Sequence, residues 1–421
     1  MAAISLEQIV GAESLKRLKF PTAKAKPLPN IIYTSEDFAR LENERLFPRV
    51  WVHAGYAHEL RDPGDLVPVR VAARPILLVK NHEGEIKAFY NSCRHRGTQL
   101  VSERCRRRKE IRCPFHSWTY DLDGNLTKAT NFLGKGKHHL HETELSDLPL
   151  APVRVDRWHD WIFVNLDGKV PPLKEYMKPF TDQLVGYDFS LLRHAHTLRL
   201  ELKCNWKLMQ ENYTEGYHVL TIHPRLNVFT SGYDHSNILH GPLFGTVIDE
   251  VNPESPDKPP LPTFPSPPKG TKFGNQQAKS FETGSNVHAL FPHFKFIASP
   301  DHVATGVEIP ERPDLIHQRW DFYFVGDNAM APPFEAQRQG ILDLYVRTFR
   351  EDRMILEAVQ NGQTSPVNGG AFSETWEGSC HHFQRLVVEC IQSKKQPFTG
   401  KLRAFKKKTR HGGRTSWGRS I

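Results

Sequence analysis

Two short cysteine–histidine pairs constrain this chain more than any other feature of its sequence. Cys93 and His95 form a C-x-H pair, and Cys113 and His116 form a C-x-x-H pair after a gap of 17 residues. Thiolates and imidazoles are ligands for soft and borderline metal ions. The two segments are therefore expected to form loops that converge on one metal centre.

The mixed composition of each pair distinguishes between two kinds of centre. A zinc site with two Cys and two His ligands usually groups Cys with Cys and His with His. In a Rieske [2Fe–2S] cluster, two Cys bind one iron and two His bind the other, and the cluster transfers single electrons. Gly97 and Pro114 flank the ligands and suit tight turns around a cluster. We interpret the four residues as Rieske ligands, with zinc as the alternative.

The residues around these pairs carry a family resemblance. Cys-Arg-His-Arg-Gly followed by Cys-Pro-Phe-His-Ser-Trp-Thr-Tyr-Asp-Leu-Asp-Gly resembles the signature of Rieske non-haem iron oxygenases, large (alpha) subunit. That family hydroxylates aromatic rings and includes choline, carnitine and betaine monooxygenase-like members. The resemblance extends from about Phe38 to about Cys390. It implies an α+β fold, in which a small antiparallel β Rieske domain precedes a helix-grip (START-like) antiparallel sheet with helices.

A Rieske cluster only moves electrons, so an oxygenase needs a second metal that activates oxygen. His218 and His223 are the best candidates for its histidine ligands. They are five residues apart, which places them about 140° apart on an ideal helix. Both can bind one metal only if the helix is distorted or ends between them, and Pro224 directly after His223 makes an ending plausible.

The third ligand of such a site should be a carboxylate, which completes a 2-His-1-carboxylate triad. Asp352 interrupts the apolar stripe of a predicted C-terminal helix, and a buried carboxylate is costly unless it is paired or binds a metal. The resemblance also points to Asp352. Asp343 and Glu357 are the alternatives, whereas Glu351 lies off the stripe and is expected to be solvated.

One further acid is a candidate for the catalytic machinery. Glu215 lies three residues before His218, so the two share a helix face. The resemblance implies that an acid here connects the iron-binding His to a Rieske His of the neighbouring subunit. It is usually Asp; some members that act on quaternary amines such as carnitine have Glu. Asn212 is a candidate for supporting the site through a hydrogen bond.

The strand pattern and the resemblance divide the chain into four segments. Residues 1–47 are expected to form a helical segment that packs on the catalytic domain, and 48–168 the Rieske [2Fe–2S] domain. Residues 169–392 are expected to form the catalytic mononuclear iron domain, and 393–421 a basic, disordered tail. Within these, the sequence predicts helices over 35–48, 205–222 and 333–361, a Pro-rich loop over 252–270, and strands over 51–56, 67–71, 76–80, 86–91, 160–166, 287–297, 302–309 and 315–325.

The net charge of +9 is misleading as a guide to partners. Residues 394–421 contain ten Lys or Arg and no acid, so removing them leaves a body with a charge of −1. No nucleic-acid partner is therefore expected, and no apolar run is long enough for a membrane span. Six cysteines without framework spacing favour a reducing, cytoplasmic setting.

These observations predict an oxygenase that uses O2 and electrons from NAD(P)H, delivered by a separate reductase or ferredoxin. The default substrate is an aromatic ring compound, and the alternative is a quaternary amine of the choline, carnitine or betaine type. A ferredoxin-like electron carrier with a ligand-binding domain is the alternative from another class. The resemblance implies a homotrimer, with a small beta subunit possible. A basic collar around the cluster could dock an acidic donor or form salt bridges: Arg94, Arg96, Arg104, Arg106, Arg107, Arg108, Lys109 and Arg112.

Overall fold

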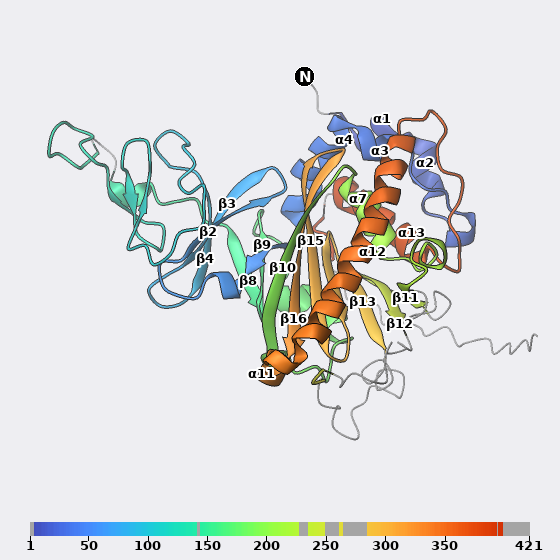
Figure 1. Cartoon of the computed structure of the whole chain (residues 1–421). Coiled ribbons are helices and arrows are strands. Elements are labelled where there is room, and N and C mark those ends of the chain that lie inside the picture. Colours follow the sequence, from blue (N-terminus) through green and yellow to red (C-terminus); the bar gives the residue numbers. More distant parts are fainter. Residues whose placement is uncertain are drawn as a thin grey trace, which may run out of the picture.

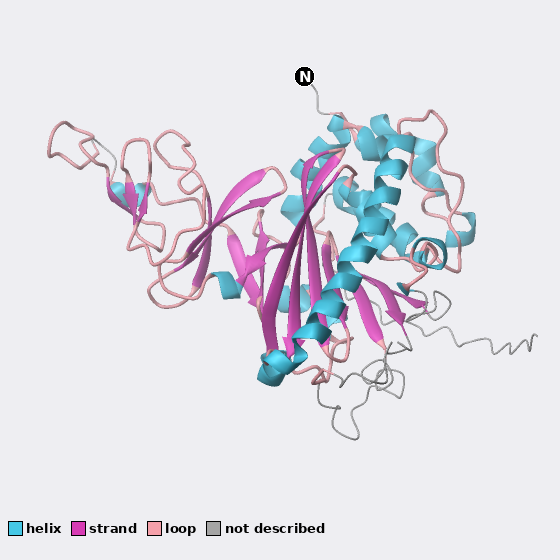
Figure 2. Cartoon of the chain, in the orientation of Figure 1, coloured by secondary structure: helices cyan, strands magenta, loops and turns pink. Residues whose placement is uncertain are grey.

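The computed structural model describes residues 4–140, 144–226, 235–248, 261–263, 284–393 and 395–398. Its larger part is a seven-stranded sheet with helices, and its smaller part contains three-stranded sheets beside it (Figures 1 and 2). This confirms the predicted α+β architecture. Residues 394 and 399–421 of the basic tail lie outside the described residues, as do 252–260 and 264–270 of the Pro-rich segment.

The seven-stranded sheet is antiparallel throughout and has the order β10-β16-β15-β14-β13-β12-β11. The longest strands, β10, β16 and β15, pair along one half of the sheet. The strands are β10 (Leu192–Leu202), β11 (His235–His240), β12 (Leu243–Ile248), β13 (Ser285–Leu290), β14 (Phe294–Ala298), β15 (His302–Arg312) and β16 (Leu315–Val325).

One face of this sheet is crossed by the long helix α12 (Glu335–Gly362), drawn in orange in Figure 1. Its buried residues are Phe349, Asp352, Leu356 and Gln360, at the three- and four-residue spacing of one helix face. Asp352 therefore lies within the buried stripe, as the sequence predicted. Helix α7 (Trp206–Tyr213) lies between α12 and helix α13 (Gly378–Gln392), which is buried along most of its length.

The N-terminal segment packs on α13. It contains α1 (Leu6–Val10), α2 (Ala12–Arg17), α3 (Ile31–Thr34) and α4 (Glu36–Leu41). The Leu28 amide donates to Gln384 Oε1 at 2.8 Å, and His381 Nε2 lies 2.8 Å from the carbonyl oxygen of Leu18. These contacts link the start of the chain to its last long helix. The four predicted segment boundaries remain predictions.

The smaller part lies on the left of Figure 1 and contains the sheets β1-β9-β8, β2-β3-β4 and β5-β6-β7. Trp161 on β9 donates through its indole N–H to Thr305 Oγ1 of the large sheet at 3.2 Å. The face of the large sheet that carries Thr305 is thus covered by this part. The strands are β1 (Val52–Tyr56), β2 (Leu66–Val71), β3 (Arg74–Lys80), β4 (Ile86–Tyr90), β5 (Ile111–Arg112), β6 (Thr119–Tyr120), β7 (Leu126–Lys128), β8 (Arg154–Trp158) and β9 (Trp161–Asn165).

Three predicted elements differ from the structure. The expected strand 287–297 is two strands, β13 and β14, because the chain turns at residues 291–293. The expected helix 205–222 is interrupted between α7 and the short α8 (Val219–Ile222). The expected helix 35–48 begins as α4 but continues as a π-helical turn, η2 (Glu42–Leu46).

Among the described residues, no helix is both long enough and apolar enough to cross a membrane.

Candidate functional site

The break between α7 and α8 brings the two candidate histidine ligands together. His218 immediately precedes α8 and His223 immediately follows it, where backbone angles of φ −115° and ψ 65° end the helix. The ring centroids are 5.0 Å apart. The Nε2 atoms of His218 and His223 lie 3.6 Å and 3.1 Å from Asp352 Oδ1. Each of the three residues offers one ligand atom, and these atoms lie within 4.8 Å of one another.

Two carboxylates hold the opposite sides of the imidazole rings. Glu215 Oε1 lies 2.5 Å from His218 Nδ1, and Glu351 Oε2 lies 2.8 Å from His223 Nδ1. If each Nδ1–H donates to its carboxylate, each Nε2 lone pair is directed towards Asp352, which is the arrangement that orients histidine ligands in metal sites. The prediction that Glu351 is solvated was wrong: its side chain is 29% exposed and is bound to His223.

The environment of Asp352 favours its ionised form. Asn212 Nδ2 donates to Asp352 Oδ1 at 2.8 Å, as expected of a supporting residue. Burial raises the pKa of Asp352, but His223, His218 and Asn212 outweigh it and hold the pKa below its usual value. For His223 the directions are reversed: burial lowers its pKa, but Asp352 and Glu351 outweigh burial and raise the pKa above its usual value.

The alternative carboxylates, Asp343 and Glu357, do not belong to the group formed by the two histidines and Asp352. Asp343 accepts a hydrogen bond from Gln339, one helical turn before it on α12. Glu357 accepts from Arg353 at 2.9 Å and from the Lys203 amide. Neither belongs to the group of three ligand atoms, so Asp352 is the carboxylate that the fold brings to the two histidines.

The site formed by His218, His223 and Asp352 opens into a cavity of about 210 Å³ between α7, α12 and the large sheet. Aromatic rings form much of its lining: Trp320 stacks on Phe349 with centroids 4.6 Å apart, and Tyr345 lies 5.8 Å from Phe349. Among the described lining residues, none is Lys or Arg. Burial lowers the pKa of the lining residue His235 to about 4, so its ring is neutral near pH 7.

The second candidate centre lies at the tip of the smaller part. Cys93 and Cys113 are buried, whereas His95 and His116 are half-buried, with their Nδ1 atoms 3.2 Å apart. The indole of Trp118 stacks on His95 with centroids 4.7 Å apart. The structure thus brings the four predicted ligands to one site, with cysteines inside and histidines near the surface.

Neighbouring residues support the cysteine side of this site. The Tyr120 hydroxyl lies 3.3 Å from Cys93 Sγ and accepts from the Arg94 amide at 3.0 Å. Burial raises the pKa of Cys93, and the hydrogen bond with Tyr120 lowers it without outweighing burial. A buried thiol becomes a thiolate most readily when a metal ion compensates its charge, which suits a cluster ligand.

Four of the eight residues of the basic collar form ion pairs within the chain. The pairs are Arg104–Glu59, Arg106–Asp65, Arg107–Asp62 and Arg112–Glu110. Arg94 and Arg96, which flank His95, are exposed and have no ion-pair partner in the described part of the chain. Any electrostatic docking of an electron donor should therefore depend on Arg94 and Arg96 more than on Arg106.

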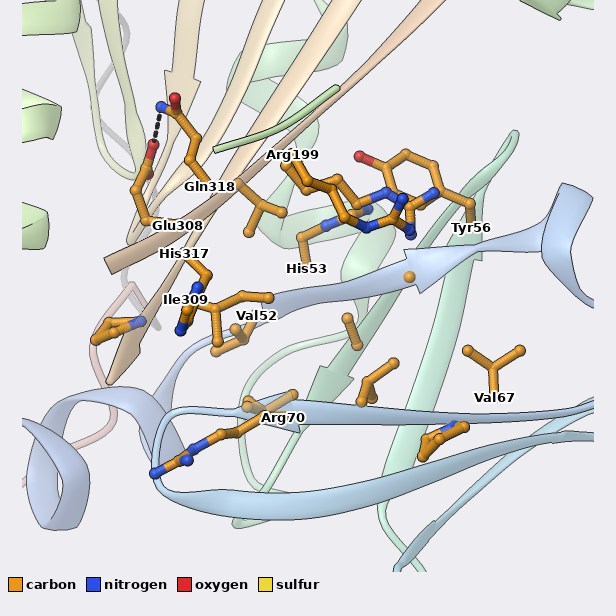
Figure 3. A pocket seen from close by; sticks show the side chains of 18 of the residues that line it. Val52, His53, Tyr56, Val67, Arg70, Arg199, Glu308, Ile309, His317 and Gln318 are labelled. Atoms are coloured by element: carbon orange, nitrogen blue, oxygen red, sulfur yellow. Dashed lines mark hydrogen bonds between the residues drawn. The ribbon is translucent and has the colours of Figure 1, made fainter. Parts of the chain in front are cut away.

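A larger cavity, of about 730 Å³, lies elsewhere in the described part of the chain. It lies between β1, β2 and the strands β10, β15 and β16 of the large sheet, as Figure 3 shows from close by. His53, Arg70 and Arg199 line it, but none of the predicted ligands does. Size alone therefore does not identify the reactive site.

Comparison with known proteins identifies a domain around each of the two candidate centres. The Rieske [2Fe–2S] domain model matches residues 50–133, and the model of the ring hydroxylating alpha subunit (catalytic domain) matches residues 189–393. This chain belongs to the Rieske non-haem iron oxygenases. It is therefore an oxidoreductase, and the ferredoxin-like carrier is not supported, because the catalytic domain is present as well as the cluster domain.

Two oxygenases resemble the chain over most of its length, and a third resembles it over about half. The carnitine monooxygenase oxygenase subunit of Acinetobacter pittii is 25% identical over 355 residues, which covers 80% of this chain and 85% of that protein. The chloroplastic choline monooxygenase of Arabidopsis thaliana is 25% identical over 384 residues, covering 88% and 84%. The glycine betaine monooxygenase oxygenase subunit of Chromohalobacter salexigens is 31% identical over 199 residues, covering 47% and 43%.

Solved structures show the same fold. A quaternary ammonium Rieske monooxygenase superposes with a TM-score of 0.73 at 23% identity, covering 89% of this chain and 98% of that one. Naphthalene 1,2-dioxygenase from Rhodococcus superposes with a TM-score of 0.66 at 19% identity, covering 86% and 94%. The same scaffold thus serves quaternary amines in one enzyme and an aromatic ring in another.

The two donor sets fit the cofactors of this family, a Rieske [2Fe–2S] cluster and a mononuclear iron. At one site His95 contacts His116 and Cys93 lies beside Cys113, and at the other two imidazoles and a carboxylate meet. When bound, the cluster supplies electrons and the iron activates O2. Glu215 and Glu351 are placed to orient the two histidines, and the adjoining cavity is mostly apolar.

Proposed function

We propose that this oxygenase acts on a quaternary ammonium compound of the carnitine, betaine or choline class. The observation that carries the proposal is the match, over most of the chain, to oxygenase subunits of carnitine monooxygenases and to a choline monooxygenase. These relatives support the quaternary amine alternative better than the aromatic ring default.

Two features of the site agree with this substrate class. Glu215 occupies the position where the family usually has Asp, and Glu is found there in some members that act on quaternary amines. Trp320, Tyr345 and Phe349 give the cavity an aromatic wall, and aromatic faces attract quaternary ammonium groups. Naphthalene-type substrates would also fit an aromatic wall, so the substrate must be tested directly.

The test is oxygen uptake by the reconstituted enzyme with NAD(P)H and a reductase. L-carnitine, glycine betaine, choline and naphthalene are compared at equal concentration. We expect uptake with one of the three quaternary amines, together with a product of C–N cleavage or alcohol oxidation in a constant ratio to O2. Coupled uptake with naphthalene alone would overturn the proposal.

We propose His218, His223 and Asp352 as the ligands of the mononuclear iron, and Cys93, His95, Cys113 and His116 as the cluster ligands. The distances and burial given above support these assignments. Replacing Asp352 by Ala should remove one iron per chain and leave the cluster signal in electron paramagnetic resonance. Loss of the cluster instead would contradict the assignment.

We further propose a ring-shaped homotrimer in which one subunit's cluster supplies the next subunit's iron through Glu215. In Figure 1 the cluster loops lie at the opposite side of the molecule from α7, which leads to His218. The description of the related quaternary ammonium monooxygenase also refers to inter-subunit electron transfer. Reduction by a separate reductase follows from the family.

Mixed trimers test this arrangement. A Cys93→Ser subunit lacks a cluster and an Asp352→Ala subunit lacks the iron, so each variant alone should be inactive. Co-expression should restore part of the activity, because one neighbour pair in the ring then has both centres. No restoration in a confirmed mixed trimer would contradict transfer between subunits. The mass of the purified assembly shows whether a beta subunit is present.

A further inference from the structure

Three side chains outside the metal ligands form a hydrogen-bonded chain that ends in the iron-site cavity. Asp301 and His302 lie at the start of β15, and Tyr345 lies on α12. His302 Nδ1 is 2.7 Å from Asp301 Oδ1, and His302 Nε2 is 3.0 Å from the Tyr345 hydroxyl. Both His302 and Tyr345 line the cavity.

The outer end of the chain is anionic. Burial raises the pKa of Asp301, but the charge and hydrogen bond of His302 outweigh it and hold the pKa below its usual value. An ionised Asp301 accepts the Nδ1 proton of His302. The Asp301 side chain is 29% exposed, so it connects this arrangement to solvent, whereas His302 is 11% exposed and Tyr345 faces the cavity.

The direction of the inner hydrogen bond depends on His302. A neutral imidazole with a proton on Nδ1 accepts the Tyr345 hydroxyl proton at Nε2. A protonated imidazole instead donates from Nε2 to the Tyr345 oxygen, which turns the hydroxyl proton into the cavity. The same carboxylate–imidazole–hydroxyl order moves protons in hydrolytic triads, where the carboxylate fixes the orientation of the ring.

We propose that Asp301, His302 and Tyr345 form a proton relay that serves the oxygenation reaction. Monooxygenation of a substrate R–H consumes O2, two electrons and two protons and gives R–OH and water. The electrons come from the reductase. Starting from protonated His302, the relay supplies one of the two protons: Tyr345 gives up its hydroxyl proton to the cavity and takes the Nε2 proton of His302, which leaves the ring neutral with its proton on Nδ1. The other proton comes from solvent. Solvent then restores the proton on His302.

Several other polar groups of the cavity are already engaged in hydrogen bonds, whereas the ring nitrogens of His235 have no partner among the described residues. Ser285 and Ser299 hydrogen-bond to each other at 2.8 Å, and the Thr348 hydroxyl donates to the Leu344 carbonyl within its own helix. Asn212 donates to Asp352. Apart from the two histidine–carboxylate pairs of the iron site, the Tyr345 chain is the hydrogen-bonded path from this cavity to a partly exposed carboxylate within the described residues.

Replacing Tyr345 by Phe tests the relay, which rests on the oxygenase chemistry and the iron site proposed above. We expect kcat to fall on the order of 100-fold, the contribution typical of positioned proton transfer, with KM within about twofold. Iron and sulfide content should be unchanged, and hydrogen peroxide should replace product. The matched control is Tyr187→Phe, which removes a buried hydroxyl that accepts from Asn286 outside the cavity.

Three outcomes would overturn the relay: unchanged kcat and coupling in Tyr345→Phe, a raised KM with unchanged kcat, or an equal loss in Tyr187→Phe. A raised KM would assign the hydroxyl to substrate binding. If wild-type enzyme turns over none of the quaternary amines but does oxidise another substrate, the substrate proposal fails and the relay is tested with that substrate.

A measurement on protein that lacks the mononuclear iron gives a readout that does not depend on turnover. In 15N spectra of labelled histidine, the His302 signals are assigned by their loss in His302→Asn. We expect a proton on Nδ1 and a hydrogen bond at Nε2 that Tyr345→Phe removes. In Asp301→Asn, loss of the charge that positions the ring should disturb this tautomer. A proton on Nε2 in the neutral wild-type ring, or no response to Tyr345→Phe, would contradict the geometry.

Discussion

Glu351 should determine how tightly the mononuclear iron is held. Its Oε2 lies 2.8 Å from His223 Nδ1, and the bond is partly shielded because the side chain is 29% exposed. In Glu351→Gln the amide oxygen can still accept the Nδ1 proton, so mainly the negative charge is lost. In Glu351→Ala both the charge and the orientation of the ring are lost.

Carboxylates that support metal-bound histidines typically contribute 10- to 100-fold in metal affinity. We therefore expect iron to bind about 10-fold more weakly to Glu351→Gln and about 100-fold more weakly to Glu351→Ala, which is roughly 1.4 and 2.7 kcal/mol. The control is Glu357→Gln, which is on the same helix but pairs with Arg353. Its iron affinity should match that of the wild type.

The assay is anaerobic competition between the protein and a coloured Fe(II) chelator, with acid-labile sulfide measured to show that the cluster is intact. An unchanged affinity in Glu351→Ala would refute the reasoning. So would an equal loss in Glu357→Gln, because the effect would then belong to the charge of α12 rather than to the hydrogen bond with His223.

Three further results are expected. Glu215→Gln should keep both metals but slow reoxidation of the reduced cluster by O2 and substrate in stopped-flow spectroscopy; wild-type rates would remove its connecting role. Burial raises the pKa of Glu211 from 4.5 to about 7, so its stabilising contribution is present below pH 4.5 and is lost as pH rises through about 7. At pH 8 Glu211→Gln should therefore be more stable than wild type by about 3 kcal/mol in denaturant unfolding, and near pH 4.5 this advantage should vanish. Arg96→Glu should slow cluster reduction by an acidic donor most strongly at low salt, whereas a loss independent of salt would argue against docking.

The sequence pointed to the candidate ligand residues because the residues that bind a metal form patterns that can be recognised locally. A mixed Cys–His pair can be recognised from a few neighbouring residues. A carboxylate within an apolar stripe can be recognised from the pattern of a single helix. Glu351 was misjudged because its partner, His223, comes from an element 128 residues away. The helical pattern showed that Glu351 leaves the buried stripe of α12, but it could not show what packs beside that stripe.

Local signals were also missed where they were available. Pro292 lies within the strand predicted over 287–297, and a proline cannot donate to a sheet ladder, so it should have divided that strand. The strands β11 and β12 and the helix α13 were not predicted. Helix α13 has a one-sided pattern that was available in the sequence: Arg385, Glu389 and Gln392 are exposed at helical spacing, whereas most of the other residues of the helix are buried.

The interruption after α7 explains how one short segment can serve the iron site. An unbroken helix would hold His218 and His223 about 140° apart, too far round to share a metal. The chain instead leaves the helix at Thr214 and passes Gly216, where a Cβ atom would lie 2.6 Å from His235 Nδ1. A side chain at this position would collide with the ring of His235 on β11. The interruption places His218 before α8 and His223 after it, and both Nε2 atoms lie near Asp352. The irregular backbone thus accompanies the ligand geometry.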